Sequence, residues 1–261
     1  MSDKIFRILA YFRHQITATN TLGHGIHSPY LYNLVRMIIY DDNSYYCFSR
    51  IEHERQRLLS CRDKIYVTDF GTGKSGERVV ADIAASALES TNVAQLIFRV
   101  ANSLTNRSYL ELGTCLGLTT AYLASTGSNS RVVTFEGSAE EIKIARGIWK
   151  SIDINNVEVI EGDISITLPQ YIHSMTTPFG LAFVDANHTK DATLRYFDLL
   201  AGRAEESSIV VIDDIHHSQQ MQSAWEIIKC DRRVTATIDC FACGMVFFNR
   251  SFEKKTYKIR I

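Results

Sequence analysis

The chain has 261 residues, of which 46% are hydrophobic, enough to bury a large core in one domain or in one domain with an appendage. Its 28 Lys and Arg residues nearly balance 29 Asp and Glu, and the formal net charge of -1 argues against a global field that attracts nucleic acid. No apolar run reaches the roughly 20 residues that span a bilayer, and the N-terminus lacks a secretory h-region, so we expect a cytoplasmic protein with reduced cysteines.

The first 62 residues have the pattern of a helical cap. The segment 4–16, KIFRILAYFRHQI, has apolar positions at helical spacing. Ser28 and Pro29 suit the N-cap and first turn of a helix over 28–40, and residues 45–62 form a charged amphipathic pattern. We therefore expect a helical cap or lid over 1–62, whose apolar, aromatic helices could also support a homodimer.

Residues 63–107 are expected to be a junction that ends in a helix starting near Ser90. Within this helix Val93, Leu96, Ile97 and Val100 recur on one face. The sequence DFGTGKSG at 69–76 superficially resembles a phosphate loop, but Thr68 stands where a Walker A motif requires glycine.

No series of acid-ended strands follows the loop 69–76 at the expected distances. We interpret it as a structural loop, with a role on the substrate side for Lys74 or Ser75 as the alternative.

The body of the chain, 108–261, alternates short β-rich runs with helical stretches. This alternation predicts an α/β fold with a mostly parallel sheet and crossover helices. A short connection between the last two runs predicts an antiparallel C-terminal hairpin. The candidate strands are SYLEL, RVVTFE, VEVIEG, LAFVD, IVVID, VTATID and GMVFFN. Cys240 and Cys243 lie at the hairpin, where we expect strand structure and no zinc, because zinc needs at least three protein ligands.

The most informative segment, YLELGTCLGLTT at 109–120, has the pattern of a buried strand, a glycine-bearing turn and a helix start. Such a turn presents backbone N–H groups to a small polar ligand. Acidic residues then follow successive strands, at Glu136, Asp163, Asp185 and the pair Asp213-Asp214. In this order of features the chain resembles a class I S-adenosylmethionine (SAM) methyltransferase, with a Rossmann-like sheet.

The resemblance implies a SAM site over the first three strands of the body. Gly113 and Gly117 would allow close backbone approach, and Glu111 would orient the turn or meet the ammonium group. Glu136 would accept hydrogen bonds from the ribose diol, and Asp163 would receive the adenine amino group unless it only forms a turn. The other expected cofactor residues are Thr114, Thr119 (alternatively a helix cap), Gly137, Ile164 against the adenine ring, and Asp185.

Clustered carboxylates at strand ends repel one another unless a cation lies between them, and a hard ion such as Mg²⁺ suits oxygen ligands. The motifs LELGTCLGLTTAYLA, FEGS, FVDANH and VVIDD are similar to the catechol and caffeoyl-CoA type O-methyltransferases. That resemblance implies a divalent metal at Asp185, Asp213 and Asp214, although Asp214 stands where the family usually has asparagine. The chain as a whole also resembles a bacterial group of SAM methyltransferases that carries an HG-hydrophobic-HSP segment.

Two histidines are candidates for acid–base chemistry at this acidic edge. His188 stands three residues beyond Asp185, where the family commonly has lysine, and an imidazole could serve there as general base. His216 follows the Asp213-Asp214 pair, and we assign it to the active site, with helix entry as the alternative. Asp185 completes the predicted catalytic set.

These observations predict a SAM-dependent methyltransferase that acts on a small-molecule hydroxyl, with a divalent metal as a candidate cofactor. The alternatives are a metal-independent methyltransferase on another acceptor, such as a protein nitrogen, and a non-catalytic SAM-binding protein. Nucleic acid is a less favoured acceptor because the chain has no basic excess. An NAD(P) oxidoreductase is disfavoured because Cys115 replaces the second glycine of the dinucleotide fingerprint.

Overall fold

The structure is a computed structural model that describes residues 3–71 and 73–261. Residues 1–2 of the predicted cap and Thr72 of the predicted loop 69–76 lie outside the described residues. The chain divides into two compact units. We call residues 42–174 the central unit, and the described residues before 42 together with Met175–Ile261 the terminal unit. The division into cap, junction and core stays a prediction.

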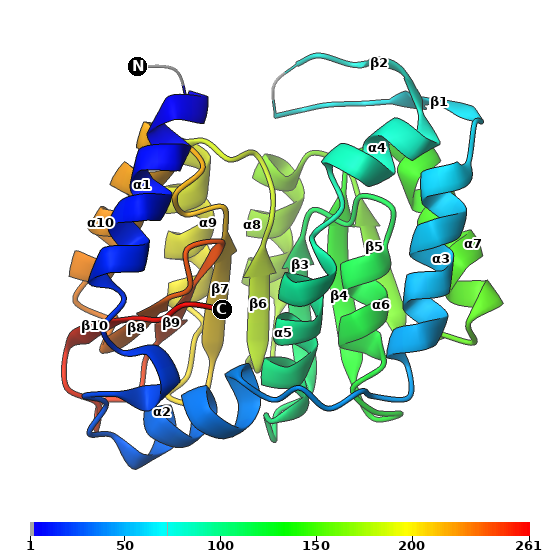
Figure 1. Cartoon of the computed structure of the whole chain (residues 1–261). Coiled ribbons are helices and arrows are strands. Elements are labelled where there is room, and N and C mark those ends of the chain that lie inside the picture. The colour runs from blue at the N-terminus through cyan, green and yellow to red at the C-terminus, as the bar shows by residue number, and fades with distance from the viewer. Residues whose placement is uncertain (1–2, 72) are drawn as a thin grey trace. The chain divides into compact units, whose positions relative to one another are not determined.

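Three parallel strands form the sheet of the central unit. They are β3 (Ser108–Leu112), β4 (Arg131–Glu136) and β5 (Val157–Glu161). The crossover helices α6 (Leu118–Ala124) and α7 (Ala139–Ser151) connect them, as the alternating pattern predicts (Figure 1). Strand β3 is buried along nearly its whole length because both of its faces are covered.

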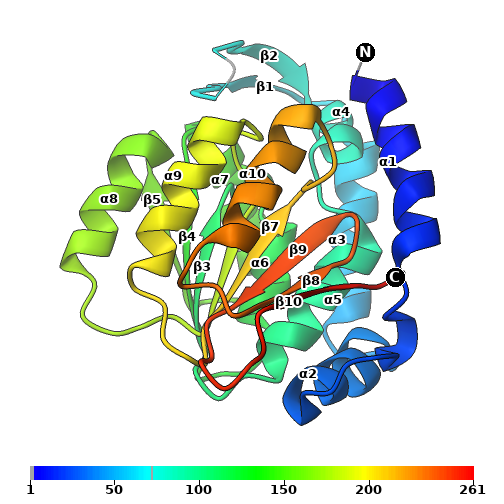
Figure 2. The ribbon, with the colours of Figure 1, turned by 90° about the vertical axis from the view of Figure 1, so that its left-hand side faces the viewer.

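The other helices of the central unit cover this sheet. They are α3 (Phe48–Ser60), α4 (Val80–Ser86), α5 (Thr91–Asn102) and α8 (Ile164–Ser174). Helices α5 and α6 lie on one face of the sheet and α8 on the other (Figure 2). The predicted start of α5 is confirmed, because the Ser90 side chain accepts the Val93 N–H at 3.4 Å, and all four predicted face residues are buried.

The sequence analysis did not predict the first two strands. β1 (Lys64–Val67) and β2 (Gly76–Val79) pair as an antiparallel hairpin, and the loop 69–76 joins them. These strands are short and mostly exposed, so they lack the apolar alternation that marks a half-buried strand.

The terminal unit holds five strands in the order β10-β8-β9-β7-β6. β6 and β7 are parallel, while β9 is antiparallel to both β7 and β8, which confirms the predicted C-terminal hairpin. β10 was not predicted and runs parallel to β8. The bounds are β6 (Leu181–Val184), β7 (Ile209–Asp213), β8 (Ala236–Asp239), β9 (Cys243–Phe247) and β10 (Lys255–Lys258).

The helices of the terminal unit flank these strands, with α1 and α9 on opposite sides of β7 and β9 (Figure 2). Ser28 caps α2 and Pro29 begins it, as predicted, but the helix continues as a π-helical segment, η2. The bounds are α1 (Asp3–Thr17), η1 (Thr21–Gly23), α2 (Pro29–Asn33), η2 (Leu34–Ile39), α9 (Lys190–Ala201) and α10 (Gln219–Cys230). Within 3–71 and 73–261, no helix has both the length and the apolar character needed to cross a membrane.

Candidate functional site

The turn after β3 has an unusual backbone that only glycine adopts readily. Gly113 and Gly117 have φ values of +97° and +80°. At the end of β3, the fully buried carboxylate of Glu111 accepts hydrogen bonds from Thr120 at 2.5 Å and from Thr134 at 2.6 Å. Of the two roles predicted for Glu111, these contacts support the one that orients the turn.

The packing of α7 against the start of α6 explains why position 117 is a glycine. A Cβ at this position would lie 2.6 Å from the Cβ of Ala145 and 2.9 Å from the Trp149 ring, both on α7. Trp149 also donates its Nε1–H to the Gly117 carbonyl at 2.8 Å. The missing side chain at 117 therefore allows α7 to pack against the start of α6, and its predicted contact with a cofactor remains a prediction.

The two predicted threonines lie inside the same turn and helix start. The Thr114 hydroxyl is 2.6 Å from that of Thr134, so one of them donates to the other. Thr119 lies in the first turn of α6, and both predicted threonines are buried.

Glu136 ends β4, and its carboxylate is held by backbone N–H groups. It accepts from Cys115 at 2.8 Å, from Gly137 at 2.7 Å and from Ser138 at 3.0 Å. Burial raises the pKa of Glu136, while these donors oppose the shift. The predicted contact of Glu136 with a ribose hydroxyl stays a prediction.

Asp163 follows β5 and caps α8. Its Oδ1 accepts the Ser165 N–H at 2.8 Å, and Gly162 before it has a φ of +131°. The predicted turn role is thus present, while the adenine contact stays a prediction. Ile164, expected against the adenine ring, begins α8 and is partly exposed.

The register of the three strands brings these groups to one edge. Leu112 lies opposite Phe135, and Glu136 lies opposite Glu161, so β3, β4 and β5 end level with one another. The Gly162 N–H also donates to the Glu136 carbonyl at 2.8 Å. In open parallel sheets, ligands bind just outside the carboxyl ends of the strands. The glycine turn, Glu136 and Asp163 therefore form a cradle suited to a small polar ligand with a diol.

Two residues of this region were missed by the sequence analysis. A Cβ on Gly137 would lie 2.5 Å from the Phe70 ring, which places the tip of the β1–β2 hairpin beside the end of β4. Burial, and then the charge of Glu136, raise the pKa of Glu141 to about 7. Phe70 could have been noticed as the aromatic residue of the loop 69–76. Glu141 carries no local signal, because acidic residues are common in the first turns of helices.

In the terminal unit, Asp185 follows β6 and Asp213 ends β7. These strands are parallel, with Val184 opposite Ile212, and carboxylate oxygens of the two aspartates lie within 4.8 Å of each other. The structure thus brings together two of the three predicted metal ligands.

Asp214, the third predicted ligand, lies close to two basic side chains. Its carboxylate is 3.3 Å from Nδ1 of His217 and 3.8 Å from the guanidinium of Arg7. His188 is placed as predicted, with Nε2 3.3 Å from Oδ1 of Asp185. The φ of His188 is +30°, which is rare for a residue with a side chain. The loop therefore holds the backbone of His188 in an uncommon conformation.

His216 is buried, and its Nε2 lies 3.0 Å from Oδ2 of Asp239. His14 also contacts this carboxylate. The predicted catalytic role of His216 stays a prediction. The sequence analysis singled out neither Asp239 nor His14. Asp239 could have been noticed because it ends a strand, as Asp213 does. His14 lies within a helical pattern and carries no local signal.

Comparison with known proteins places these features in a family context. Residues 110–215 match the family model described as a methyltransferase domain. No curated protein matches the sequence. Among solved structures, an O-methyltransferase from Bacillus cereus in complex with SAH is 19% identical, with a TM-score of 0.58 over 80% of this chain and 93% of that chain. The O-methyltransferase TomG from Streptomyces achromogenes, in complex with SAM, is 15% identical, with a TM-score of 0.58 over 95% of this chain and 99% of that chain.

Proposed function

We propose that the protein transfers the methyl group of SAM to a hydroxyl of a small molecule, because residues 110–215 match the model of a methyltransferase domain and the chain shares the fold of SAM- and SAH-bound O-methyltransferases. The observation that carries this proposal is the level ending of β3, β4 and β5. It gathers the glycine turn, Glu136 and Asp163 at one edge, in the order that a ligand with an amino acid, a ribose and a base requires.

The residues of the cradle fit SAM by their chemistry. The backbone of the turn at Gly113 would hold the methionine end of SAM. Glu111 would keep this turn in place through its hydrogen bond from Thr120. Glu136 would accept from the ribose, and Asp163 with Ile164 would hold the adenine. SAM supplies a methyl group already activated on a sulfonium, so the protein mainly has to orient the acceptor and exclude water.

Two candidate acid–base residues lie in the terminal unit. Asp185 lies 3.3 Å from the His188 imidazole and would orient it to take the proton of the acceptor hydroxyl. Asp185 and Asp213 have the oxygen donors that a hard divalent ion such as Mg²⁺ prefers, and such an ion would lower the pKa of the acceptor hydroxyl.

A metal-independent form of the reaction is the second candidate. Arg7 and His217 both approach the carboxylate of Asp214, so the Arg7 guanidinium already offsets part of the acidic cluster. In this form His188 would act on the hydroxyl without help from a cation.

The experiment is an assay of SAH formation from SAM with a panel of small phenols, catechols and aliphatic alcohols, with Mg²⁺ or with EDTA. We expect a product methylated on oxygen, identified by mass spectrometry. A product methylated on nitrogen would reject the hydroxyl as acceptor. Tight SAM binding without turnover on any acceptor would favour a non-catalytic SAM-binding protein.

A further inference from the structure

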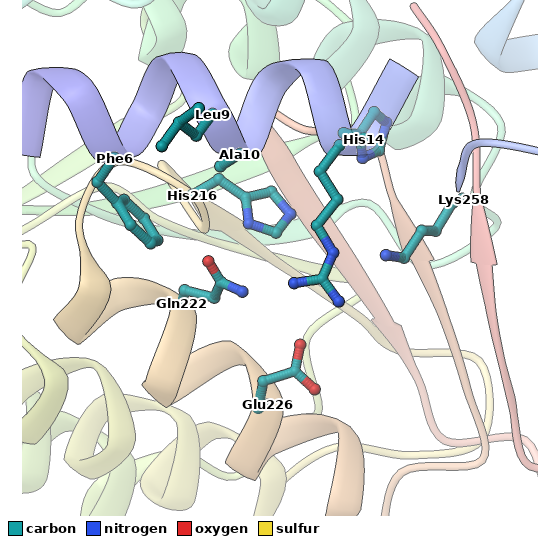
Figure 3. Close-up of a pocket in the computed structure, with 9 residues that line it drawn as sticks. Phe6, Leu9, Ala10, His14, His216, Gln222, Glu226 and Lys258 are labelled. Atoms are coloured by element: carbon teal, nitrogen blue, oxygen red, sulfur yellow. The ribbon is translucent and has the colours of Figure 1, made fainter. Parts of the chain in front are cut away.

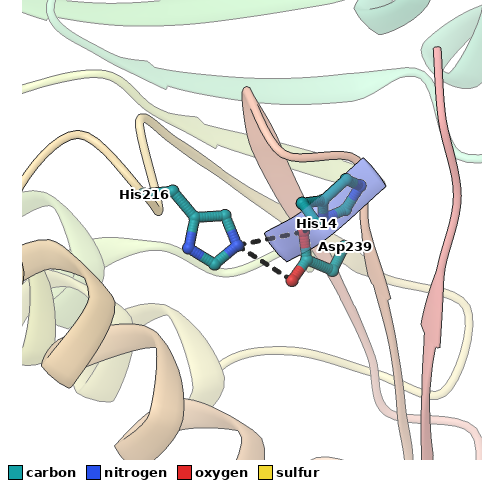
Figure 4. A group of neighbouring side chains, drawn as sticks. All are labelled: His14, His216 and Asp239. Carbon is teal, nitrogen blue, oxygen red and sulfur yellow. Dashed lines mark hydrogen bonds and ion pairs between the residues drawn. The ribbon is translucent and has the colours of Figure 1, made fainter. Parts of the chain in front are cut away.

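A buried cluster of two histidines and an aspartate lies in the terminal unit. Of its three residues, only His216 was assigned above to methyl transfer. His14 comes from α1, His216 from the segment after β7, and Asp239 from the end of β8 (Figure 4). Their side chains are only 3%, 9% and 1% exposed. His14 Nδ1 is 3.3 Å from Asp239 Oδ1, and His216 Nε2 is 3.0 Å from Asp239 Oδ2.

The hydrogen bonds of His14 fix which of its nitrogens carries the proton. Nε2 lies 2.9 Å from the backbone carbonyl of Ile259, which can only accept, so Nε2 is the donor. Among the residues that the structure describes, Nδ1 has no hydrogen-bond partner, although it is buried. Burial lowers the pKa of His14, which favours the neutral imidazole. The Nδ1 lone pair then faces the oxygen of Asp239 across 3.3 Å with nothing positive between them.

The carboxylate of Asp239 is also suited to bind a cation. Although burial opposes its ionisation, hydrogen bonding, first of all from His216, keeps the pKa of Asp239 below its usual value. Its Oδ1 also accepts the Phe241 N–H at 3.0 Å. An ionised carboxylate and a neutral imidazole nitrogen are both metal ligands. Two such electron donors buried side by side are stabilised when a cation lies between them.

We propose that His14, His216 and Asp239 bind one divalent transition-metal ion, with Zn²⁺ as the best fit. Ligand atoms about 2.0–2.1 Å from one Zn²⁺ lie about 3.3 Å apart in tetrahedral geometry, and the contacts to Asp239 are 3.0–3.3 Å. Histidine ligands commonly donate their second N–H to a backbone carbonyl, as His14 does to Ile259. Imidazole nitrogens also favour zinc-class ions over Mg²⁺ or Ca²⁺.

The fourth coordination position would open onto a cavity of about 220 Å³ that both histidines line. Gln222 and Glu226 from α10 and Lys258 also line this cavity (Figure 3). The cavity gives water or a small oxygen ligand access to the ion. In this assignment His216 is a metal ligand and no longer a free general base, and the site does not depend on the proposed methyl transfer.

The metal would also hold the N-terminal helix in place. Among the described residues of α1, His14 alone is buried, while apolar residues such as Phe12 and Ile16 are 61% and 80% exposed. Helix α1 therefore has little apolar burial of its own to fix it on β8 and the C-terminal segment. A bond from His14 to a shared ion would supply that attachment.

The test is a titration of the chelator-treated full chain with Co²⁺, which reports its coordination through visible absorption. We expect one ion per chain with the intense absorption of a four-coordinate site, and no thiolate charge-transfer band from Cys240 or Cys243. His14→Gln should weaken binding at least about 100-fold. Exposed His24 offers a matched control, and His24→Gln should bind Co²⁺ as the wild type does.

Two further measurements keep the result interpretable. Asp185→Asn should leave the intense absorption of the four-coordinate site unchanged, even if it removes a second, weakly absorbing ion from the acidic edge. Limited trypsin digestion at the basic residues of α1 should slow when Zn²⁺ is added to the wild type but not to the His14→Gln variant. If circular dichroism and thermal unfolding show that His14→Gln is folded and its Co²⁺ affinity equals that of the wild type, the proposal is wrong. Absence of stoichiometric binding by the wild type would reject it as well.

Discussion

The carboxylate of Glu136 accepts the backbone N–H of Cys115 at 2.8 Å, which ties the end of β4 to the glycine turn after β3. The same carboxylate holds the N–H groups of Gly137 and Ser138. One side chain therefore supports both the glycine turn after β3 and the segment that follows β4. A side chain without carboxylate oxygens would leave these N–H groups without this partner.

Glu136→Gln should weaken SAM binding by about 10- to 100-fold, because a hydrogen bond to a charged group contributes about 1.5–3 kcal/mol. The amide replaces one acceptor oxygen with a donor that faces backbone N–H groups. Isothermal titration with SAM measures the change. Glu140→Gln, four residues along in α7, is the control and should bind normally. An unchanged affinity in the Glu136 variant would remove this residue from the cofactor site.

Glu141 should make the protein less stable as the pH rises. Its pKa is about 7 in the fold against 4.5 ordinarily, so the folded state holds the proton more tightly. Its contribution is complete below about pH 4.5 and is lost as the pH rises to about 7, a change of about 3 kcal/mol at about 1.4 kcal/mol per unit.

Urea unfolding of the wild type and of Glu141→Gln at a series of pH values tests this expectation. The variant is neutral throughout, so its stability relative to the wild type should increase between pH 5 and pH 8. A constant difference over that range would show that Glu141 ionises normally in the fold.

Gly117→Ala should destabilise the protein by about 1–3 kcal/mol through overpacking, with a further cost from its φ of +80°. The new methyl group would meet Ala145 at 2.6 Å. Gly147→Ala, in the exposed part of α7 with nothing within 4 Å of its Cβ position, should instead stabilise the protein by up to about 1 kcal/mol. Thermal unfolding of both variants gives the comparison, and a neutral Gly117 variant would contradict the packing described here.

Asp185→Asn should abolish or strongly reduce methyl transfer while SAM still binds in the cradle of the central unit. The amide cannot supply the negative charge that supports the His188 imidazole at 3.3 Å. Asp191→Asn, at an exposed position in the first turn of α9, is the control. SAH release measures turnover. If EDTA and the Asp185 variant both leave turnover intact, the reaction uses neither the metal nor this carboxylate.

The strands of the α/β body other than β10 could be predicted because each is an apolar run bounded by polar residues, and each acidic residue of the cradle ends or follows such a run. The β1–β2 hairpin lacks this signal since its strands are exposed. The role of Gly117 depends on Trp149, which lies 32 residues further on, so no local pattern reveals it. The pairing of His14 with Asp239 likewise joins residues from the two ends of the chain.

The most direct test of the proposed function is isothermal titration of the wild type with SAM, SAH and, separately, NADH. We predict binding of SAM and SAH with dissociation constants on the order of micromolar and no comparable binding of NADH. Absence of SAM and SAH binding, or tight binding of NADH alone, would contradict the assignment of the cradle at Gly113, Glu136 and Asp163.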